Sequence, residues 1–293
     1  MSELIVARGL GKTFGTTRAL DDVNFRVESG RIVGLIGPNG AGKTTALKAL
    51  LGLTRFEGEL SVLGLNPYLQ RHRLMQDVCF IADVAVLPRW IRVRQLIDFV
   101  AATHPKFRRE VCEHFLSRSD IKKDSRVKEL SKGMVTQLHL ALVMAIDARL
   151  LVLDEPTLGL DILYRKAFYE ALLNDYFDAE RTILVTTHQV EEVEHLLTDL
   201  MFIQHGRLVL NSSMDAVQDS FVEVLIAPER LAEAERLQPV YRRELFGRKL
   251  FLFEGVARDR LAALGELHRP SVARRSRATP SKRNSFRPNS SRR

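Results

Sequence analysis

Cysteine, tryptophan and long apolar runs are scarce in this sequence. Two cysteines, Cys79 and Cys112, and one tryptophan occur among 293 residues. The two cysteines have no metal-type spacing, so we expect reduced, buried or half-buried thiols of the kind found in a cytoplasmic protein. No apolar run approaches the roughly eighteen residues of a membrane-spanning helix. The N-terminal residues lack a basic region followed by an apolar stretch, so we expect no signal peptide.

Acidic residues are absent from residues 269–293, where nine Lys and Arg side chains stand. The net charge of +8 therefore belongs to this tail, and the rest of the chain is close to neutral. Its high Ser, Arg and Pro content and its very few apolar residues predict a disordered basic tail over residues 268–293. One interpretation is a solvated extension without function. The other is contact with anionic lipid headgroups or nucleic acid, although no interleaved aromatic residues indicate sequence-specific nucleic-acid binding.

The most informative stretch is residues 37–44, Gly-Pro-Asn-Gly-Ala-Gly-Lys-Thr, which fits G-x-x-x-x-G-K-[ST] without a mismatch. An apolar run over residues 32–36 precedes it, and a helix-forming run over residues 46–51 follows it. A strand, a glycine-rich loop and a helix in this order are the context of a phosphate-binding loop. The sequence therefore predicts a nucleotide site here.

The chemistry of this loop assigns a task to each part. Its glycines let successive backbone N–H groups point inward at an anion, and the helix that begins near Lys43 adds the positive end of its dipole. We expect Lys43 to reach the β- and γ-phosphates, Thr44 to place its hydroxyl on Mg²⁺, and Thr45 to bond a neighbouring phosphate. The predicted ATP-binding residues of the loop are Gly37, Pro38, Asn39, Gly40, Ala41, Gly42, Lys43, Thr44 and Thr45.

Two carboxylates end a second apolar run, at residues 150–155. Four aliphatic residues in a row are typical of a central parallel strand that is covered on both faces. At its end, Asp154 is a candidate Mg²⁺ ligand through a water. Glu155 is a candidate for polarising the water that attacks the γ-phosphate.

Strands alternate with helices along most of the chain, which predicts a mainly parallel α/β sheet. Residues 3–28 indicate an antiparallel β portion, and helical patterns dominate over about 84–147. We expect one nucleotide-binding domain over residues 1–215. Residues 220–267 read as a small β-α-β-α appendage without a catalytic constellation, and the tail follows.

Three further motifs complete a recognisable set. Leu130-Ser131-Lys132-Gly133-Met134 precedes a long predicted helix, Leu158-Gly159-Leu160-Asp161 follows Glu155, and His188 follows the apolar run over residues 182–187. Together with the phosphate loop, this order resembles the ATP-binding subunit of ABC transporters over roughly residues 3–215. The resemblance implies a P-loop NTPase core with an antiparallel β subdomain and a helical subdomain.

The resemblance also implies individual roles. Phe14 corresponds to the aromatic residue that stacks on adenine. Ser131 and Gly133 match the signature that touches the γ-phosphate of the opposite subunit's ATP. Asp161 matches a loop that crosses the dimer interface, and His188 matches the switch histidine that contacts the γ-phosphate. The predicted catalytic set is therefore Glu155, His188 and Lys43.

Two motifs depart from the family pattern, the signature and the position after the predicted strand over residues 78–82. Lys132 replaces the usual second glycine of the signature, and Met134 stands where glutamine is common. Asp83 stands where the family usually has a glutamine. An aspartate can bind Mg²⁺ directly or through water, so Asp83 joins Thr44 and Asp154 as a candidate metal ligand.

The resulting functional hypothesis is the ATP-hydrolysing engine of an ABC transporter. It implies a homodimer or heterodimer around two ATP, separate transmembrane permease subunits, and a peripheral location on the cytoplasmic face of the inner membrane. Residues 83–128 would dock the permease, with Trp90 and Arg92 as candidate anchors. The Ser-Lys-Gly-Met variant and the appendage resemble the ABC-2 exporter type. A soluble ABC-type ATPase acting on ribosomes or nucleic acid and a module that holds ATP without turnover are the alternatives.

Overall fold

The computed structural model describes residues 2–81, 87–157, 162–188, 190–245 and 247–268. The chain divides into two compact units, Met1–Ser213 and Met214–Arg293. The first contains both nucleotide-site motifs, and the second begins just before the region predicted to be an appendage. Asp83, Asp161 and the basic tail after residue 268 lie outside the described residues.

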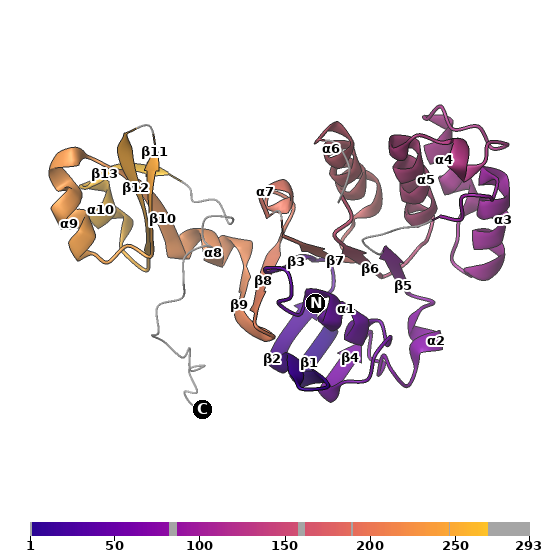
Figure 1. Ribbon diagram of the computed structural model, residues 1–293, viewed down its shortest axis with the longest axis horizontal. Coiled ribbons are helices and arrows are strands. Elements are labelled where there is room, and N and C mark those ends of the chain that lie inside the picture. Colours follow the sequence, from indigo (N-terminus) through magenta and orange to yellow (C-terminus); the bar gives the residue numbers. More distant parts are fainter. Residues whose placement is uncertain (1, 82–86, 158–161, 189, 246, 269–293) are drawn as a thin grey trace. The chain divides into compact units, whose positions relative to one another are not determined.

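A three-stranded antiparallel sheet opens the first unit (Figure 1), with strand order β2-β1-β4. Its strands are β1 (Glu3–Phe14), β2 (Thr17–Glu28) and β4 (Glu57–Val62). The turn between β1 and β2 places Phe14 opposite Thr17, with Gly15 at a φ of 54°. This positive φ suits glycine because it has no Cβ to clash.

A six-stranded, mainly parallel sheet carries the nucleotide motifs, in the order β5-β6-β7-β3-β8-β9. Its strands are β3 (Ile32–Ile36), β5 (Val78–Ile81), β6 (Leu150–Asp154), β7 (Thr182–Thr187), β8 (Asp199–Gln204) and β9 (Arg207–Ser213). Every residue of β3, β6 and β7 is buried, as expected for strands with cover on both faces. The parallel neighbours β6 and β7 therefore deliver their following residues to the same sheet edge.

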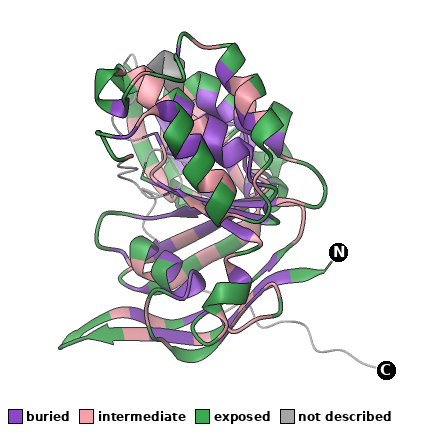
Figure 2. Ribbon diagram, turned by 90° about the vertical axis from the view of Figure 1, so that its right-hand side faces the viewer, coloured by how far each residue is buried: buried purple, intermediate pink, exposed green. Residues whose placement is uncertain are grey.

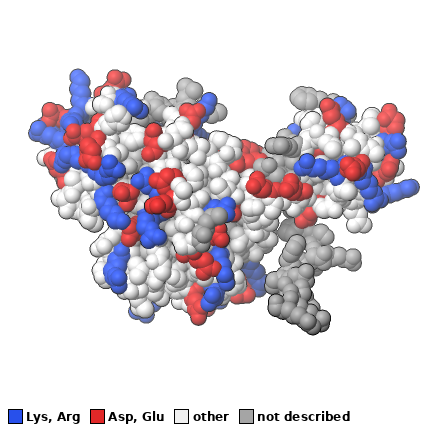
Figure 3. Space-filling view, turned by 180° about the vertical axis from the view of Figure 1, so that it is seen from behind, with Lys and Arg blue, Asp and Glu red and all other residues white. Residues whose placement is uncertain are grey.

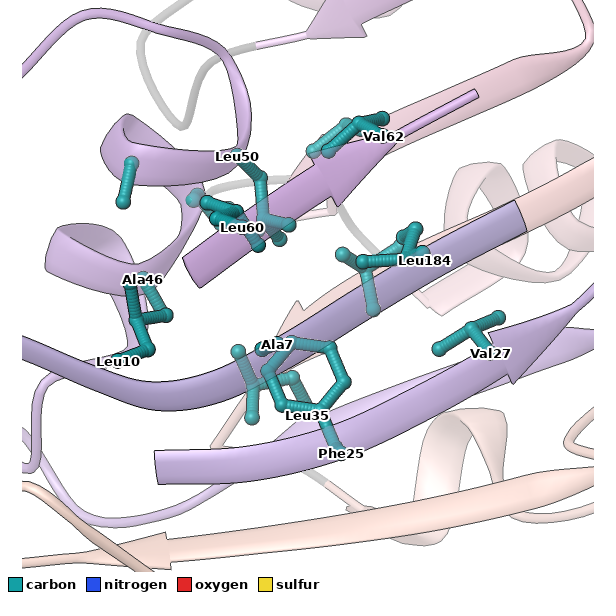
Figure 4. Close-up of a cluster of buried hydrophobic side chains, with 14 of the residues drawn as sticks. Ala7, Leu10, Phe25, Val27, Leu35, Ala46, Leu50, Leu60, Val62 and Leu184 are labelled. Carbon is teal, nitrogen blue, oxygen red and sulfur yellow. The ribbon is translucent and has the colours of Figure 1, made fainter. Parts of the chain in front are cut away.

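Helix α1 (Lys43–Leu50) follows the phosphate loop and packs its apolar side into the core between the two sheets. Figure 4 shows this core, in which Leu50 from α1 lies near Leu60 of β4, and Leu35 of β3 lies near Phe25 of β2. The buried side of α1 fixes where the helix N-terminus points. The sequence predicts an anion site at that N-terminus.

Helices α3 (Val93–Thr103), α4 (Arg109–Ser117) and α5 (Lys132–Met144) form a separate helical layer with its own buried cluster. Figure 2 shows buried and exposed residues alternating along these helices, and the buried ones make up this cluster. Cys112 lies in this cluster and Cys79 lies in β5; both are free, and burial raises the pKa of each thiol to about 12. The short element η1 (Val127–Glu129) belongs to this layer, whereas α2 (Arg71–Leu74) lies between β4 and β5 and packs Leu74 into the core between the two sheets.

The sequence pattern predicts one helix after β6, over residues 162–176, and one after β7, over residues 190–197. The helix expected over residues 162–176 is α6 (Ile162–Ala171) with a π-helical end, η2 (Leu172–Tyr176). The helix expected over residues 190–197 ends early, as α7 (Val190–Val193). Both helices leave the sheet edge at which the carboxylates of β6 stand.

The second unit is a four-stranded antiparallel sheet in the order β11-β12-β10-β13. Its elements are α8 (Met214–Ser220), β10 (Phe221–Ile226), η3 (Pro228–Arg230), α9 (Leu231–Arg236), β11 (Tyr241–Leu245), β12 (Arg248–Glu254), α10 (Arg258–Ala262) and β13 (Gly265–His268). The sequence pattern predicts a helix over residues 257–267, but helix α10 ends at Ala262 and the chain continues as β13. Gly265 permits this strand, because a Cβ there would lie 2.1 Å from the Leu225 carbonyl oxygen.

Candidate functional site

The phosphate loop takes a shape that depends on its glycines. Gly40 and Gly42 have φ values of 78° and 111°, which L side chains rarely adopt. Gly37 is required for a different reason, since a Cβ there would lie 2.2 Å from the Ile203 carbonyl oxygen. The loop is therefore a tight, open-faced turn that ends on the first residue of α1.

Lys43 folds back across this loop. Its Nζ donates to the carbonyl oxygens of Gly37 at 2.7 Å and Pro38 at 3.3 Å, and it lies 3.8 Å from Glu155 Oε1. The side chain is only 7% exposed, so its charge acts in a poorly screened environment. A cation in this position can meet a terminal phosphate between the loop and Glu155.

Asp154 is held from two sides. Thr186 of the neighbouring strand β7 donates its hydroxyl to Asp154 Oδ1 at 2.5 Å, and Thr44 donates to Oδ2 at 3.4 Å. Asp154 itself is buried. This arrangement brings a hydroxyl from α1 and a carboxylate from β6 together, which is a set of oxygen ligands suited to Mg²⁺. The sequence pattern did not indicate the role of Thr186.

Glu155 and His188 meet at the ends of β6 and β7. The His188 Nδ1 lies 2.9 Å from Glu155 Oε2, and the His188 backbone N–H donates to the same oxygen at 3.4 Å. Glu155 has a φ of 48°, and its N–H donates to the Thr186 carbonyl oxygen at 3.1 Å. This strained backbone turns the carboxylate away from the strand direction and toward Lys43 and His188.

A cavity of about 460 Å³ opens over the phosphate loop. Its lining residues are Thr17, Arg18, Ala19, Pro38, Asn39, Gly40, Ala41, Gly42, Lys43, Thr44, Thr45, Asp154, Glu155, His205 and Gly206. The structure thus brings together the loop from Pro38 to Thr45 and both carboxylates. It adds residues of β2 and of the turn between β8 and β9, which belong to none of the short motifs.

The turn between β8 and β9 is hydrogen-bonded to the phosphate loop and braces it. Gly206 donates its N–H to the Ala41 carbonyl oxygen at 2.9 Å and accepts from the Asp21 N–H at 2.9 Å. His205 and Gly206 both have positive φ values, 48° and 75°, as a two-residue hairpin of this kind requires. The sequence predicts the hairpin itself from His-Gly between two strands. Its contact with the phosphate loop links residues too far apart in sequence to predict.

The remaining predicted residues are not part of this cavity lining. Phe14 is 50% exposed at the end of β1, with Lys12 Nζ 4.9 Å from its ring centroid. Ser131 caps α5 by accepting the Met134 N–H at 3.2 Å, and Gly133 lies in the first turn of that helix. Lys132 is exposed as the first residue of α5. An exposed aromatic ring and a helix N-terminus are both available to meet a ligand or a second chain.

Among the residues that the structure describes, no helix is long and apolar enough to cross a membrane. On the face seen in Figure 3, Lys and Arg side chains alternate with Asp and Glu across the surface. Mixed charge of this kind differs from the single-sign surface typical of proteins that bind a nucleic-acid backbone.

Comparisons with known proteins identify the family. The ABC transporter family model matches residues 20–158. Nod factor export ATP-binding protein I of Rhizobium sp. (strain N33) is 34% identical over 263 residues, which cover 84% of each chain. ABC transporter ATP-binding protein YtrB of Bacillus subtilis (strain 168) is 27% identical over 225 residues, covering 76% of this chain and 77% of that protein.

Two solved structures confirm the predicted α/β fold. A structure described as the ATP binding subunit of an ABC transporter has a TM-score of 0.67 at 24% identity, covering 74% of this chain and 92% of that one. A bacterial Atm1-family ABC exporter with ATP bound has a TM-score of 0.64 at 17% identity, covering 74% of this chain and 40% of that one. At these identities the matches establish the fold alone. The glycine loop, the paired carboxylates and the identity to full-length relatives together place this chain in the ABC transporter family, as an ATP-binding subunit of the kind whose ATP hydrolysis drives transport.

Proposed function

We propose that this chain powers export through a separate membrane permease, working as a dimer that encloses two ATP molecules. The observation that carries the proposal is that Lys43 and His188 both approach Glu155, which lines the phosphate-loop cavity: Lys43 Nζ lies 3.8 Å from Glu155 Oε1, and His188 Nδ1 lies 2.9 Å from Oε2. A cation, a carboxylate and an imidazole in contact there are suited to cleaving a terminal phosphate. A site that only held ATP would not need the last two.

Each group then has a task in hydrolysis. The backbone N–H groups of the loop and Lys43 hold the phosphates, and Thr45 adds a hydroxyl. Glu155 accepts a hydrogen bond from the attacking water and orients it toward the γ-phosphorus. His188, already 2.9 Å from Glu155 Oε2, stabilises that carboxylate's orientation and donates toward the γ-phosphate as charge builds on it.

The residues present fit a magnesium ion. Thr44 and Asp154 offer a hydroxyl and a carboxylate from facing elements, and Asp83 is proposed as a third oxygen ligand. When bound, the ion would neutralise charge on the β- and γ-phosphates. Within the chain itself, Thr186 keeps the Asp154 carboxylate turned toward Thr44.

A second subunit would complete each nucleotide site. We assign Ser131 and Gly133 to the γ-phosphate of the ATP held by the opposite subunit, and Asp161 to the interface between the subunits. Phe14 would stack on the adenine, since half of its surface is open. The partner is a second copy of this chain or a similar ATP-binding subunit.

The direction and setting of transport are part of the same proposal. Relatives named for Nod factor export are more than 30% identical to this chain over most of their length. The permease would dock on the helical layer over residues 83–128, where Trp90 is 72% exposed and Arg92 Nη1 donates to the Asp124 carbonyl oxygen. We place the subunit on the cytoplasmic face of the inner membrane, with the basic tail close to anionic lipid.

Steady-state ATP turnover of the Glu155→Gln variant tests the proposal. The amide keeps the shape of the side chain but is a poor proton acceptor, so we expect turnover to fall about 100-fold or more while ATP still binds. Glu59→Gln is the matched control, because Glu59 is an exposed carboxylate in β4 that pairs only with Arg8 among the described contacts. Wild-type turnover in Glu155→Gln would overturn the assignment.

A further inference from the structure

The segments that carry Glu155 and His188 make a second contact, outside the lining of the phosphate-loop cavity. Thr157, two residues after Glu155, donates its hydroxyl to Oε2 of Glu192 at 3.3 Å. Glu192 lies in α7, four residues after His188. Two side-chain contacts therefore join the segments: Glu155 with His188, and Thr157 with Glu192.

The direction of these hydrogen bonds follows from counting protons. Thr157 also lies 3.3 Å from the hydroxyl of Tyr169, and it has only one proton to donate. A carboxylate only accepts, so Thr157 donates to Glu192 and Tyr169 donates to Thr157. Burial, the largest cause, raises the pKa of Tyr169 to about 12, so its hydroxyl keeps its proton at neutral pH. Tyr169 therefore donates to Thr157, and Thr157 donates to Glu192.

Arg165 occupies the other oxygen of the same carboxylate. Its Nη1 forms an ion pair with Glu192 Oε1. Arg165 and Tyr169 stand one turn apart on α6, so both present their polar ends to the same side of that helix. Side-chain exposures of 23% for Arg165 and 25% for Glu192 make this a partly buried pair, which is less screened than a surface one.

We propose that Glu192, held by Arg165, Thr157 and Tyr169, is a positioning residue that sets the distance between Glu155 and His188 for ATP hydrolysis. The inference rests on the proposed roles of Glu155 and His188. Among the described residues, no hydrogen bond or ion pair joins Glu192 to the cavity lining or to the side chains of Glu155 and His188, so it acts through the backbone of α7 and of residues 155–157.

The backbone pairing between β6 and β7 ends close to Glu155. Strand pairing between β6 and β7 fixes Asp154 opposite Thr186, and one further bond joins the Glu155 N–H to the Thr186 carbonyl. Beyond this point, the two segments are joined by the contacts of Glu155 with His188 and of Thr157 with Glu192. A displacement of about 1 Å at a reacting group can lower a rate about 100-fold.

The test is steady-state ATP turnover of Glu192→Gln in the full chain, together with equilibrium binding of ATP. The amide keeps the shape but loses the charge that pairs with Arg165. We expect kcat to fall about tenfold and the affinity for ATP to stay within about twofold, because the phosphate loop is untouched. Tyr169→Phe, which removes one hydroxyl and keeps the ring, is expected to lower kcat about threefold.

Glu170→Gln is the control on the same helix, because Glu170 forms an exposed pair with Lys166 on the outer side of α6. It is expected to leave kcat and ATP affinity unchanged. Wild-type kcat in Glu192→Gln would overturn the inference, and so would equal losses in kcat and in ATP affinity. Tyr169→Phe keeps the test decisive if Glu192→Gln does not fold.

A double-mutant cycle separates positioning from general stability. If Glu192 acts through His188, Glu192→Gln has little further effect on kcat in a His188→Ala background. A full tenfold further loss there would contradict the inference. The Glu155→Gln variant separates this inference from the proposed function. If Glu155→Gln keeps its turnover, the proposed function fails. If Glu155→Gln is inactive while Glu192→Gln is fully active, only the role of Glu192 is overturned.

Discussion

At the scale of the residue, Thr186 shows how a single hydroxyl orders a reactive site. It is completely buried in β7, where threonine fits as a β-branched residue, and its Oγ1 bonds Asp154 at 2.5 Å. The same Oγ1 accepts the Glu155 N–H at 3.3 Å. One side chain thus touches both residues of the carboxylate pair. Thr186 lies in the neighbouring strand β7, outside the motif at residues 150–155 that contains the two carboxylates.

Replacing Thr186 with valine keeps the shape and removes these bonds. Hydrogen bonds to charged groups contribute about 1.5–3 kcal/mol, so we expect the free energy of unfolding to fall by about that amount in urea denaturation. We also expect ATP turnover to fall about tenfold, because the Asp154 carboxylate is then free to rotate. Thr136→Val is the control, since that hydroxyl bonds only a backbone carbonyl within α5. Unchanged turnover in Thr186→Val would show that other groups orient Asp154.

At the scale of the element, the turn between β8 and β9 acts as a brace on the phosphate loop. Its Gly206 is bonded to Ala41 on one side and to Asp21 on the other. Arg207 reinforces the contact by an ion pair with Asp21 at 2.6 Å. The brace therefore joins the loop to both sheets of the first unit.

Comparing Gly206→Ala with Gly64→Ala isolates the value of this brace. The two glycines have nearly equal φ values, 75° and 76°, so both substitutions impose similar backbone strain of about 1 kcal/mol. A Cβ at Gly64 meets nothing within 4 Å, whereas at Gly206 it would lie 2.8 Å from the Ala19 carbonyl oxygen. We expect Gly206→Ala alone to weaken ATP binding, measured by equilibrium titration, and to be the less stable variant. Equal affinities in the two variants would argue against a brace.

Elements built on local signals were predictable from the sequence, and contacts between distant segments were not. The strand, glycine loop and α1 follow from residues 32–51, and the buried strand β6 follows from its aliphatic run. The early end of α10 and the strand β13 were missed, because an apolar pattern over a short span suits both a helix and a strand. The Thr157–Glu192 and Gly206–Ala41 contacts join segments that no short motif relates.

At the scale of the whole molecule, the residues proposed to bind ATP fall into two groups, one that lines the cavity and one at the start of α5. The phosphate loop and the carboxylates line the cavity, while Ser131 caps α5 and does not line it. A signature at a helix N-terminus has unused N–H groups that suit an anion. Under the proposed function, a second subunit brings this end of α5 to the nucleotide.

Light scattering of the hydrolysis-deficient chain tests this arrangement. We expect Glu155→Gln to be monomeric without nucleotide and dimeric with saturating ATP and Mg²⁺, since uncleaved ATP bridges the two subunits. Adding Ser131→Glu should abolish the dimer while each chain still binds ATP, because a carboxylate would oppose the γ-phosphate. A dimer that persists in the double variant would rule out the proposed place of Ser131.

The two buried thiols have a practical consequence for following these rearrangements. Cys79 and Cys112 are free and buried, and a pKa of about 12 keeps each protonated, so neither reacts readily with maleimides or iodoacetamides. A single cysteine introduced at an exposed position such as Leu69, which is 74% exposed, would then be the preferred attachment point for a fluorophore or spin label. The native background needs no cysteine removal before distance spectroscopy.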